Sequence, residues 1–84
     1  MKIELNPRST RFEALLSICT KHFGEPRISG SHHIFKTPWA GDPRLNLQRD
    51  GQMAKPYQVK QVVAALERLE KQEKLEKLEN ENAD

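Results

Sequence analysis

The chain has 84 residues, of which 36% are hydrophobic and 31% are charged. These values are typical of one small soluble domain, because a chain of this length buries only about 60–65% of its unfolded surface and has room for a single core. No apolar run approaches the roughly 18 residues that a membrane span needs, and residues 1–7 lack the apolar segment of a signal peptide. Cys19 is the only cysteine, which excludes a disulfide within the chain. We therefore expect a reduced, cytoplasmic protein.

Charge divides unevenly along the chain. Residues 1–62 carry ten Lys or Arg and five Asp or Glu, a net charge of +5, whereas residues 63–84 carry four bases and seven acids, a net charge of −3. The basic surface therefore belongs to the folded part, where it would suit a polyanion such as RNA. An ordinary solvated surface has a similar charge, so charge alone does not assign a function.

The first predicted element is a helix that begins at Thr10. Thr10 and Glu13 have the spacing of a capping box, in which a hydroxyl and a carboxylate bind the free amides of a helix start. Apolar residues then recur at helical spacing, and Gly24 supplies a C-terminal stop. The apolar stripe consists of Phe12, Leu15, Leu16, Cys19 and Phe23. One face of this helix is expected to pack on a sheet.

Short alternating segments, interrupted by glycines and prolines, follow the first helix and are typical of strands and turns. The predicted elements are strands at 26–29, 32–37 and 44–48, a connecting loop at 39–43 and a turn at Asp50–Gly51. Together they predict a small antiparallel meander.

Alternation places two adjacent histidines on opposite faces of the second strand. His32 shares one face with Ile34, and His33 shares the other with Phe35. Phe35 is expected to face the core, although Ile34 on the opposite face means that the sequence does not decide which face is buried.

The last predicted element is a helix that starts at about Pro56, since proline suits the first position of a helix. Its apolar residues fall within about 120° of one another, the width of a helix that covers a sheet. They are Val59, Val62, Val63, Leu66 and Leu69, whereas Leu75 and Leu78 lie on the other side of the helix. Residues 1–69 are therefore expected to form a single α+β domain with both helices packed on one face of the sheet.

Residues 70–84 are predicted to form a charged, solvated helical extension with a disordered end from Asn80. Pairs of Glu and Lys at i,i+4, such as Glu70 with Lys74, stabilise such a helix by only about 0.2–0.5 kcal/mol each. The apolar seam of a coiled coil is not sustained in this segment. A partner-binding role for the extension is therefore the weaker interpretation.

Metal and nucleotide motifs are missing from the sequence. His22, His32, His33 and Cys19 form no His-x-x-x-His or Cys-x-x-Cys pattern, and the glycines have neither dinucleotide-binding nor P-loop spacing. Ser31 precedes His32, but neighbours on an extended segment point to opposite faces, so Ser31 is expected to be a turn residue and not a nucleophile. We expect no metal and no cofactor.

Histidine supports one metal-free reaction, the attack of an RNA 2′-OH on the adjacent phosphate. An imidazole with an ordinary pKa of about 6.5 suits proton transfer at neutral pH, and nearby cations would stabilise the charged phosphorane. The cationic candidates are Lys36, Arg44, Arg49 and Lys55. On these residues alone, a structural role for the histidine pair stays open beside the catalytic one.

The segment Gly30-Ser31-His32-His33-Ile34-Phe35-Lys36 resembles the histidine-bearing segment of HicA toxins, which are small mRNA interferases of type II toxin–antitoxin modules. The order of helix, three-stranded meander and helix is that of the double-stranded-RNA-binding-domain-like fold of these proteins. The resemblance covers roughly residues 10–69. It implies a metal-independent endoribonuclease that cleaves mRNA, with His32 catalytic, and a HicB-like antitoxin that masks the site. His33 is the alternative, because family members differ over which histidine of the pair is essential.

The chain departs from many HicA sequences at residues 53–60, which read Met-Ala-Lys-Pro-Tyr-Gln-Val-Lys, and in its acidic tail. Lys55 and Lys60 flank the start of the second helix, where related folds bind RNA phosphates, and Tyr57 can stack on a base. The candidate RNA-binding residues are Ser31, Lys36, Arg44, Arg49, Lys55, Tyr57 and Lys60. Two alternatives remain: a non-catalytic RNA-binding module, and a protein-interaction domain that uses the acidic tail.

Overall fold

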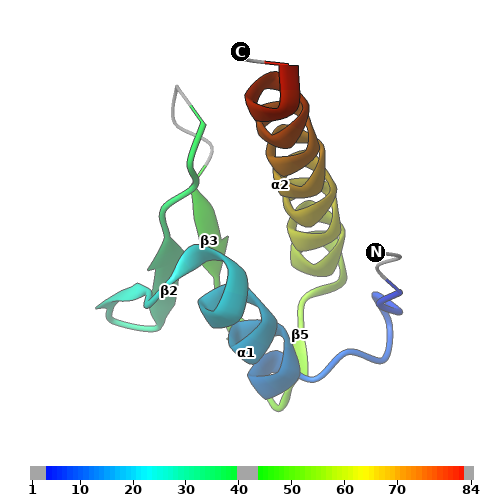
Figure 1. The fold of residues 1–84 in the computed structure, drawn as a ribbon. Coiled ribbons are helices and arrows are strands. Elements are labelled where there is room, and N and C mark those ends of the chain that lie inside the picture. The colour runs from blue at the N-terminus through cyan, green and yellow to red at the C-terminus, as the bar shows by residue number, and fades with distance from the viewer. Residues whose placement is uncertain (1–3, 40–43, 83–84) are drawn as a thin grey trace.

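The computed structural model describes residues 4–39 and 44–82, with side chains as far as Leu78. In chain order its elements are α1 (Phe12–Phe23), β1 (Arg27–Ser29), β2 (His32–Phe35), β3 (Leu45–Leu47), β4 (Arg49–Asp50), β5 (Met53–Ala54) and α2 (Pro56–Asn82). Strands β1, β2 and β3 form one antiparallel sheet in that order, and β4 pairs with β5 in a separate hairpin (Figure 1). The predicted α+β fold, with its order of helix, three-stranded sheet and helix, is confirmed.

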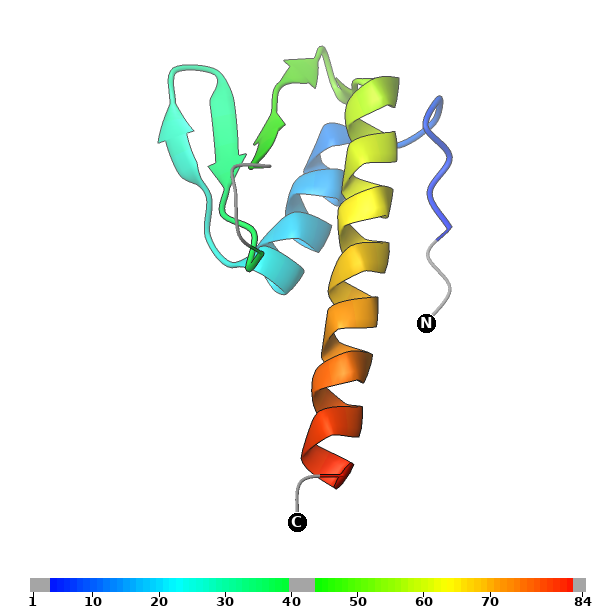
Figure 2. The same cartoon turned by 90° about the horizontal axis from the view of Figure 1, so that it is seen from above.

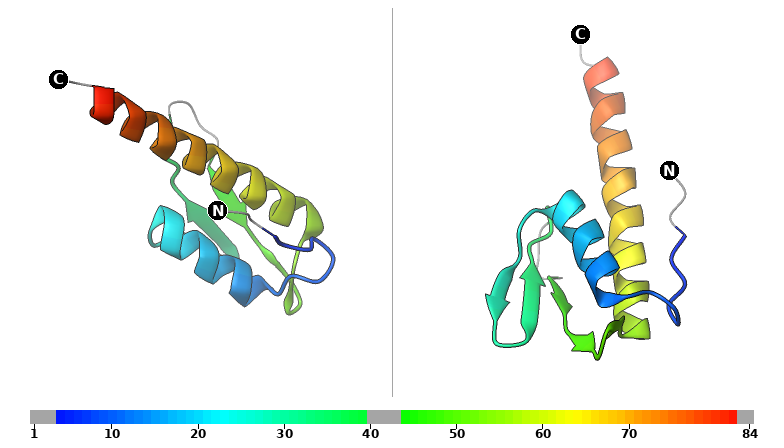
Figure 3. Two further views of the ribbon diagram at one scale, coloured as in Figure 1. Left: turned by 45° about the vertical axis from the view of Figure 1, so that its right-hand side comes forward. Right: turned by 90° about the horizontal axis from the view of Figure 1, so that it is seen from below.

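The hydrophobic core lies between the two helices and one face of the sheet (Figures 2 and 3). Phe35 of β2 and Leu45 and Leu47 of β3 point to this face and are buried. The other core residues are Phe12, Leu15 and Cys19 of α1, Ala54 of β5, and Val59, Val62, Ala65 and Leu66 of α2. The predicted stripe of α1 is confirmed, with Leu16 and Phe23 only partly buried, whereas Val63 and Leu69 of the stripe predicted for α2 do not belong to the core. The structure decides that the face of Phe35 is the buried one.

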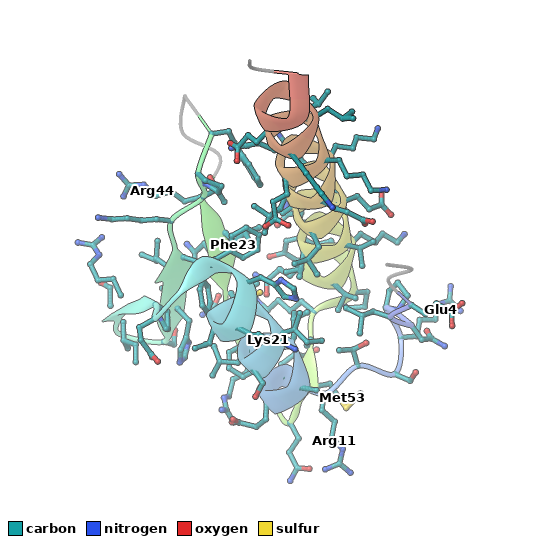
Figure 4. The ribbon with its side chains drawn as sticks, in the orientation of Figure 1. Glu4, Arg11, Lys21, Phe23, Arg44 and Met53 are labelled. Carbon is teal, nitrogen blue, oxygen red and sulfur yellow. The ribbon has the colours of Figure 1, made fainter. Side chains whose placement is uncertain are left out.

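The start of α1 differs from the prediction. The helix begins at Phe12, after Arg11 in an extended conformation, and no side chain caps it. Arg11 forms a β-bridge with Met53 (Figure 4), and the amide of Phe12 donates to the carbonyl oxygen of Gln52 at 3.0 Å. The predicted capping box is wrong, because pairing with the β5 segment keeps Arg11 extended and the helix starts only after it. Thr10 Oγ1 instead donates to the carbonyl oxygen of Asn6 at 2.6 Å.

A tight turn fixes the register between β1 and β2. Ser29 pairs with His32 across a two-residue turn, and Gly30 has a φ of 60°. Glycine at the first central position is typical of type II′ turns, whose twist matches that of the flanking strands. The register then places Ile28 opposite His33, and His33 opposite Leu47 of β3.

The hairpin of β4 and β5 was missed, although a turn at Asp50–Gly51 was predicted. In the structure Asp50 is the last residue of β4, and the turn consists of Gly51 and Gln52. Each of its strands has only two residues, which is too short for alternation to show in the sequence. The three strands of the main sheet are likewise shorter than predicted, by one or two residues at their ends. The predicted loop at 39–43 lies outside the described residues apart from Trp39.

Helix α2 continues well beyond the core. Leu66 is its last core residue, yet the helix runs to Asn82, and Leu75 and Leu78 are 61% and 53% exposed. The disorder predicted from Asn80 is wrong for residues 80–82, whose backbone is helical, and residues 83–84 lie outside the described part. None of the helices within 4–39 and 44–82 has the length and apolar character to cross a membrane.

Cys19 provides a pH-dependent test of the core. Burial raises the pKa of its thiol from 9.0 to about 12, because the thiolate would lose its hydration. The unfolded state therefore releases the proton first, and stability is full below pH 9 and falls as pH rises towards 12. We expect a loss of up to about 1.4 kcal/mol per pH unit in urea unfolding between pH 9 and 11.

Cys19→Ala is the matched control for this measurement. It should be less stable at neutral pH, because it leaves a cavity, but its stability should fall less steeply above pH 9. Equal slopes for the two proteins would show that the thiol is not the group responsible.

Candidate functional site

The face of the sheet opposite the core carries polar side chains. Because β2 alternates and Phe35 is buried, His32 and Ile34 point to this outer face. Asn46 lies opposite Ile34 on β3 and shares that face. His32 Nδ1 is 3.0 Å from Asn46 Oδ1. An amide oxygen only accepts hydrogen bonds, so Nδ1 carries the hydrogen, and in the neutral ring Nε2 keeps its lone pair.

A surface pocket of about 310 Å³ lies beside His32, between β3 and the first turns of α2. The described residues that line it are His32, Arg44, Asn46, Gln48, Tyr57, Gln58 and Gln61. β3 is one of the two edge strands of the sheet, so the pocket occupies the seam between this edge and the helix. None of these seven residues is acidic. The pocket therefore combines hydrogen-bonding amides with a guanidinium, an imidazole and a phenol.

A hydrogen-bond network connects the parts of this pocket through Gln48. Its Nε2 donates to Ser31 Oγ at 2.9 Å, and its Oε1 accepts from Lys55 Nζ at 3.3 Å. Its backbone N–H donates to Gln58 Oε1 at 3.1 Å. Gln58 is only 5% exposed, and its Nε2 also lies 3.3 Å from Tyr57 Oη. Hydrogen bonds of Gln48 thus connect the turn before β2, the end of β3 and the start of α2.

Five of the residues predicted from the sequence come together here. His32, Arg44 and Tyr57 line the pocket, and Ser31 and Lys55 reach it through Gln48. Tyr57 is 57% exposed, so its ring is accessible to a ligand.

His33 lies on the other side of the sheet. Its ring packs edge-on against Phe12 of α1, with ring centroids 5.2 Å apart. Its Nδ1 is buried and has no hydrogen-bond partner among the described residues. The structure thus separates the two histidines into one on the pocket face and one on the helix face.

The remaining predicted residues do not line the pocket. Arg49 binds Glu13 of α1, with Nη2 2.6 Å from Oε1, and its guanidinium lies 4.8 Å from the ring centroid of Phe12. Lys36 follows the end of β2, and Lys60 is exposed on α2. Arg49 therefore joins the hairpin to α1, while the two lysines stay at the surface outside the pocket.

Sequence reasoning missed Asn46, Gln48, Gln58 and Gln61. Uncharged amides are common on any protein surface, and nothing in their spacing distinguishes them. Gln58 carried a weak signal, since it stands beside Val59 in the first turn of a helix and next to the apolar stripe. Only the approach of α2 to β3 brings the four amides together.

The described residues contain no group of three or more His, Cys, Asp or Glu side chains that could hold a metal ion. Comparison with family models, with curated proteins and with solved structures found no match to this chain.

Among the residues around the pocket, Gln58 is the one whose substitution should lower the stability of the protein most. In Gln58→Leu the N–H of Gln48 loses its acceptor, so we expect the free energy of unfolding to fall by about 1–3 kcal/mol. Gln61→Leu is the matched control, because Gln61 is exposed on the same helix, and it should change stability by less than about 0.5 kcal/mol. Urea unfolding monitored by circular dichroism measures both, and equal effects would contradict the role of the buried amide.

Proposed function

We propose that the protein is a HicA-like endoribonuclease in which His32 transfers the proton of an RNA 2′-OH. The observation that carries this proposal is the position of His32 in a pocket whose described lining residues include no acid, with Nδ1 bound to Asn46 and Arg44 nearby. A histidine held in this way is oriented, accessible and has one ring nitrogen available.

The nucleophile and the leaving group of this reaction both belong to the RNA, so the protein has to supply only a base and positive charge. Nε2 of the neutral ring accepts the proton while the 2′ oxygen attacks the neighbouring phosphorus, and the P–O5′ bond breaks. The leaving 5′ oxygen takes a proton from water, which gives a 2′,3′-cyclic phosphate and a 5′-hydroxyl. Arg44 and Lys55 stabilise the extra negative charge on the phosphorane, and none of the described lining residues is a carboxylate that would repel the phosphate.

The biological setting belongs to the same proposal. The substrate is mRNA, the compartment is the cytoplasm, and a HicB-like antitoxin covers the pocket. The resemblance of residues 30–36 to HicA toxins supports this setting. An adjacent gene for a small HicB-like protein, whose product binds this chain and suppresses its toxicity, is the expected partner.

Three proteins test the chemistry: the wild type, His32→Ala and His33→Leu. We expect His32→Ala to cleave RNA about 10²- to 10⁴-fold more slowly with an unchanged melting temperature, since His32 is an exposed side chain. His33→Leu preserves an apolar contact with Phe12 and should retain most of the activity. The measurement is cleavage of a fluorescent RNA in EDTA, with detection of 2′,3′-cyclic phosphate ends.

The result separates the candidate functions. Full activity of His32→Ala would remove His32 from the mechanism, and loss of activity only in His33→Leu would assign the role to His33. A wild type that binds RNA in a salt-dependent way but leaves it intact would be a non-catalytic RNA-binding module. A wild type without RNA affinity, whose partner binding requires residues 70–84, would be a protein-interaction domain.

A further inference from the structure

A second pocket adjoins the first along the same seam. It has a volume of about 390 Å³ and is lined by Arg44, Leu45, Gln61, Ala64, Ala65 and Arg68. Arg44 and Gln61 also line the pocket of His32, so the two pockets are consecutive parts of one groove between β3 and α2. The groove follows the helix axis from Tyr57 to Arg68, a distance of about 16 Å at about 1.5 Å per residue.

The second pocket has the chemistry of a nucleotide subsite. The buried Leu45 lines it, and Ala64 and Ala65 add small apolar side chains against which a nucleobase can pack. Arg44 and Arg68 provide guanidinium groups, which suit phosphates. None of its lining residues within the described part of the chain is acidic, although the segment of α2 that follows is rich in Glu.

Arg68 lies against one aromatic side chain. Its guanidinium carbon lies 4.5 Å from the ring centroid of Trp39. Trp39 packs edge-on against Phe23 of α1, with centroids 6.2 Å apart. A guanidinium that already lies over an aromatic ring loses less side-chain freedom when it binds a phosphate. The contact therefore links the end of α1 to the far end of the groove.

We propose that this second pocket binds an additional nucleotide of single-stranded RNA, and that Arg68 contacts its phosphate. The inference rests on the proposed function, since it extends the strand that His32 would cleave. A stacked strand advances about 3.4 Å per nucleotide, so the groove of about 16 Å accommodates about five nucleotides. A dinucleotide at His32 would leave the second pocket empty.

The experiment compares Arg68→Gln with Lys74→Gln, which removes the same charge from a different face of α2. Lys74 lies beyond the core and pairs with Glu70 at 3.5 Å. Binding of a fluorescent single-stranded RNA of eight nucleotides is measured by anisotropy between 50 and 300 mM salt, with His32→Ala as the background to prevent cleavage. We expect Arg68→Gln to weaken binding several-fold and to reduce the salt slope by about 0.7, and Lys74→Gln to reduce it less.

Cleavage of RNAs of two and eight nucleotides by otherwise wild-type protein gives the second readout. Arg68→Gln should slow cleavage of the longer RNA and leave that of the dinucleotide unchanged, and Arg68→Lys should recover part of the loss. Circular dichroism at the assay temperature verifies that each variant is folded.

The failures of the two proposals are distinguishable. Cleavage by the wild type, with equal effects of Arg68→Gln and Lys74→Gln, overturns the second subsite and leaves the ribonuclease standing. Salt-dependent binding that depends on Arg68, without any cleavage, supports the subsite and contradicts the enzyme. An acidic peptide of equal charge that binds as tightly as the RNA overturns the assignment of the pocket to a nucleotide.

Discussion

The burial of Phe35 against the two helices is the constraint on which the site depends. Side chains alternate along a strand, so a buried Phe35 places His33 on the helix side and His32 on the outer face. The pairing of β2 with β3 then brings Asn46 within 3.0 Å of His32. A shift of register by one residue would exchange the two histidines and expose the phenylalanine, which makes the position of His32 a consequence of core packing.

Helix α2 serves both the core and the groove with different faces. Its apolar stripe, which includes Val59 and Val62, is buried on the sheet, while Tyr57, Gln61 and Arg68 lie along the seam with β3. Gln58 stands between these faces and is nearly buried. The Gln58 side chain accepts a hydrogen bond from the backbone of Gln48 and so joins α2 to the end of β3. The width of the groove therefore depends on how the helix packs against this strand.

Charge is distributed in a way that suits an anionic ligand. The described residues that line the two pockets include Arg44, Arg68 and His32 but no Asp or Glu. The acidic residues of α2 are concentrated beyond Leu66, where the helix leaves the core. Attraction of a polyanion to the groove is therefore compatible with a total charge of only +2, because fields at short range depend on nearby groups more than on the total.

Local signals in the sequence were sufficient to predict the two helices and the three strands of the main sheet. Helical spacing predicted both apolar stripes, Gly24 and Pro56 marked a helix end and a helix start, and alternation separated His32 from His33. The capping box at Thr10 failed because pairing with the β5 segment, more than 40 residues away in sequence, competes for the same backbone. The hairpin of β4 and β5 was missed because two-residue strands carry no periodicity.

The sequence by itself therefore determined the two helices, the three strands of the main sheet and the pair of adjacent histidines. Only the tertiary structure decided which histidine faces outward, and only it assembled the groove. The amides of Asn46, Gln48, Gln58 and Gln61, together with Arg68, come from β3, the β3–β4 junction and α2. Such a site depends on contacts between elements, and polar residues without a fixed spacing leave no pattern that local rules can detect.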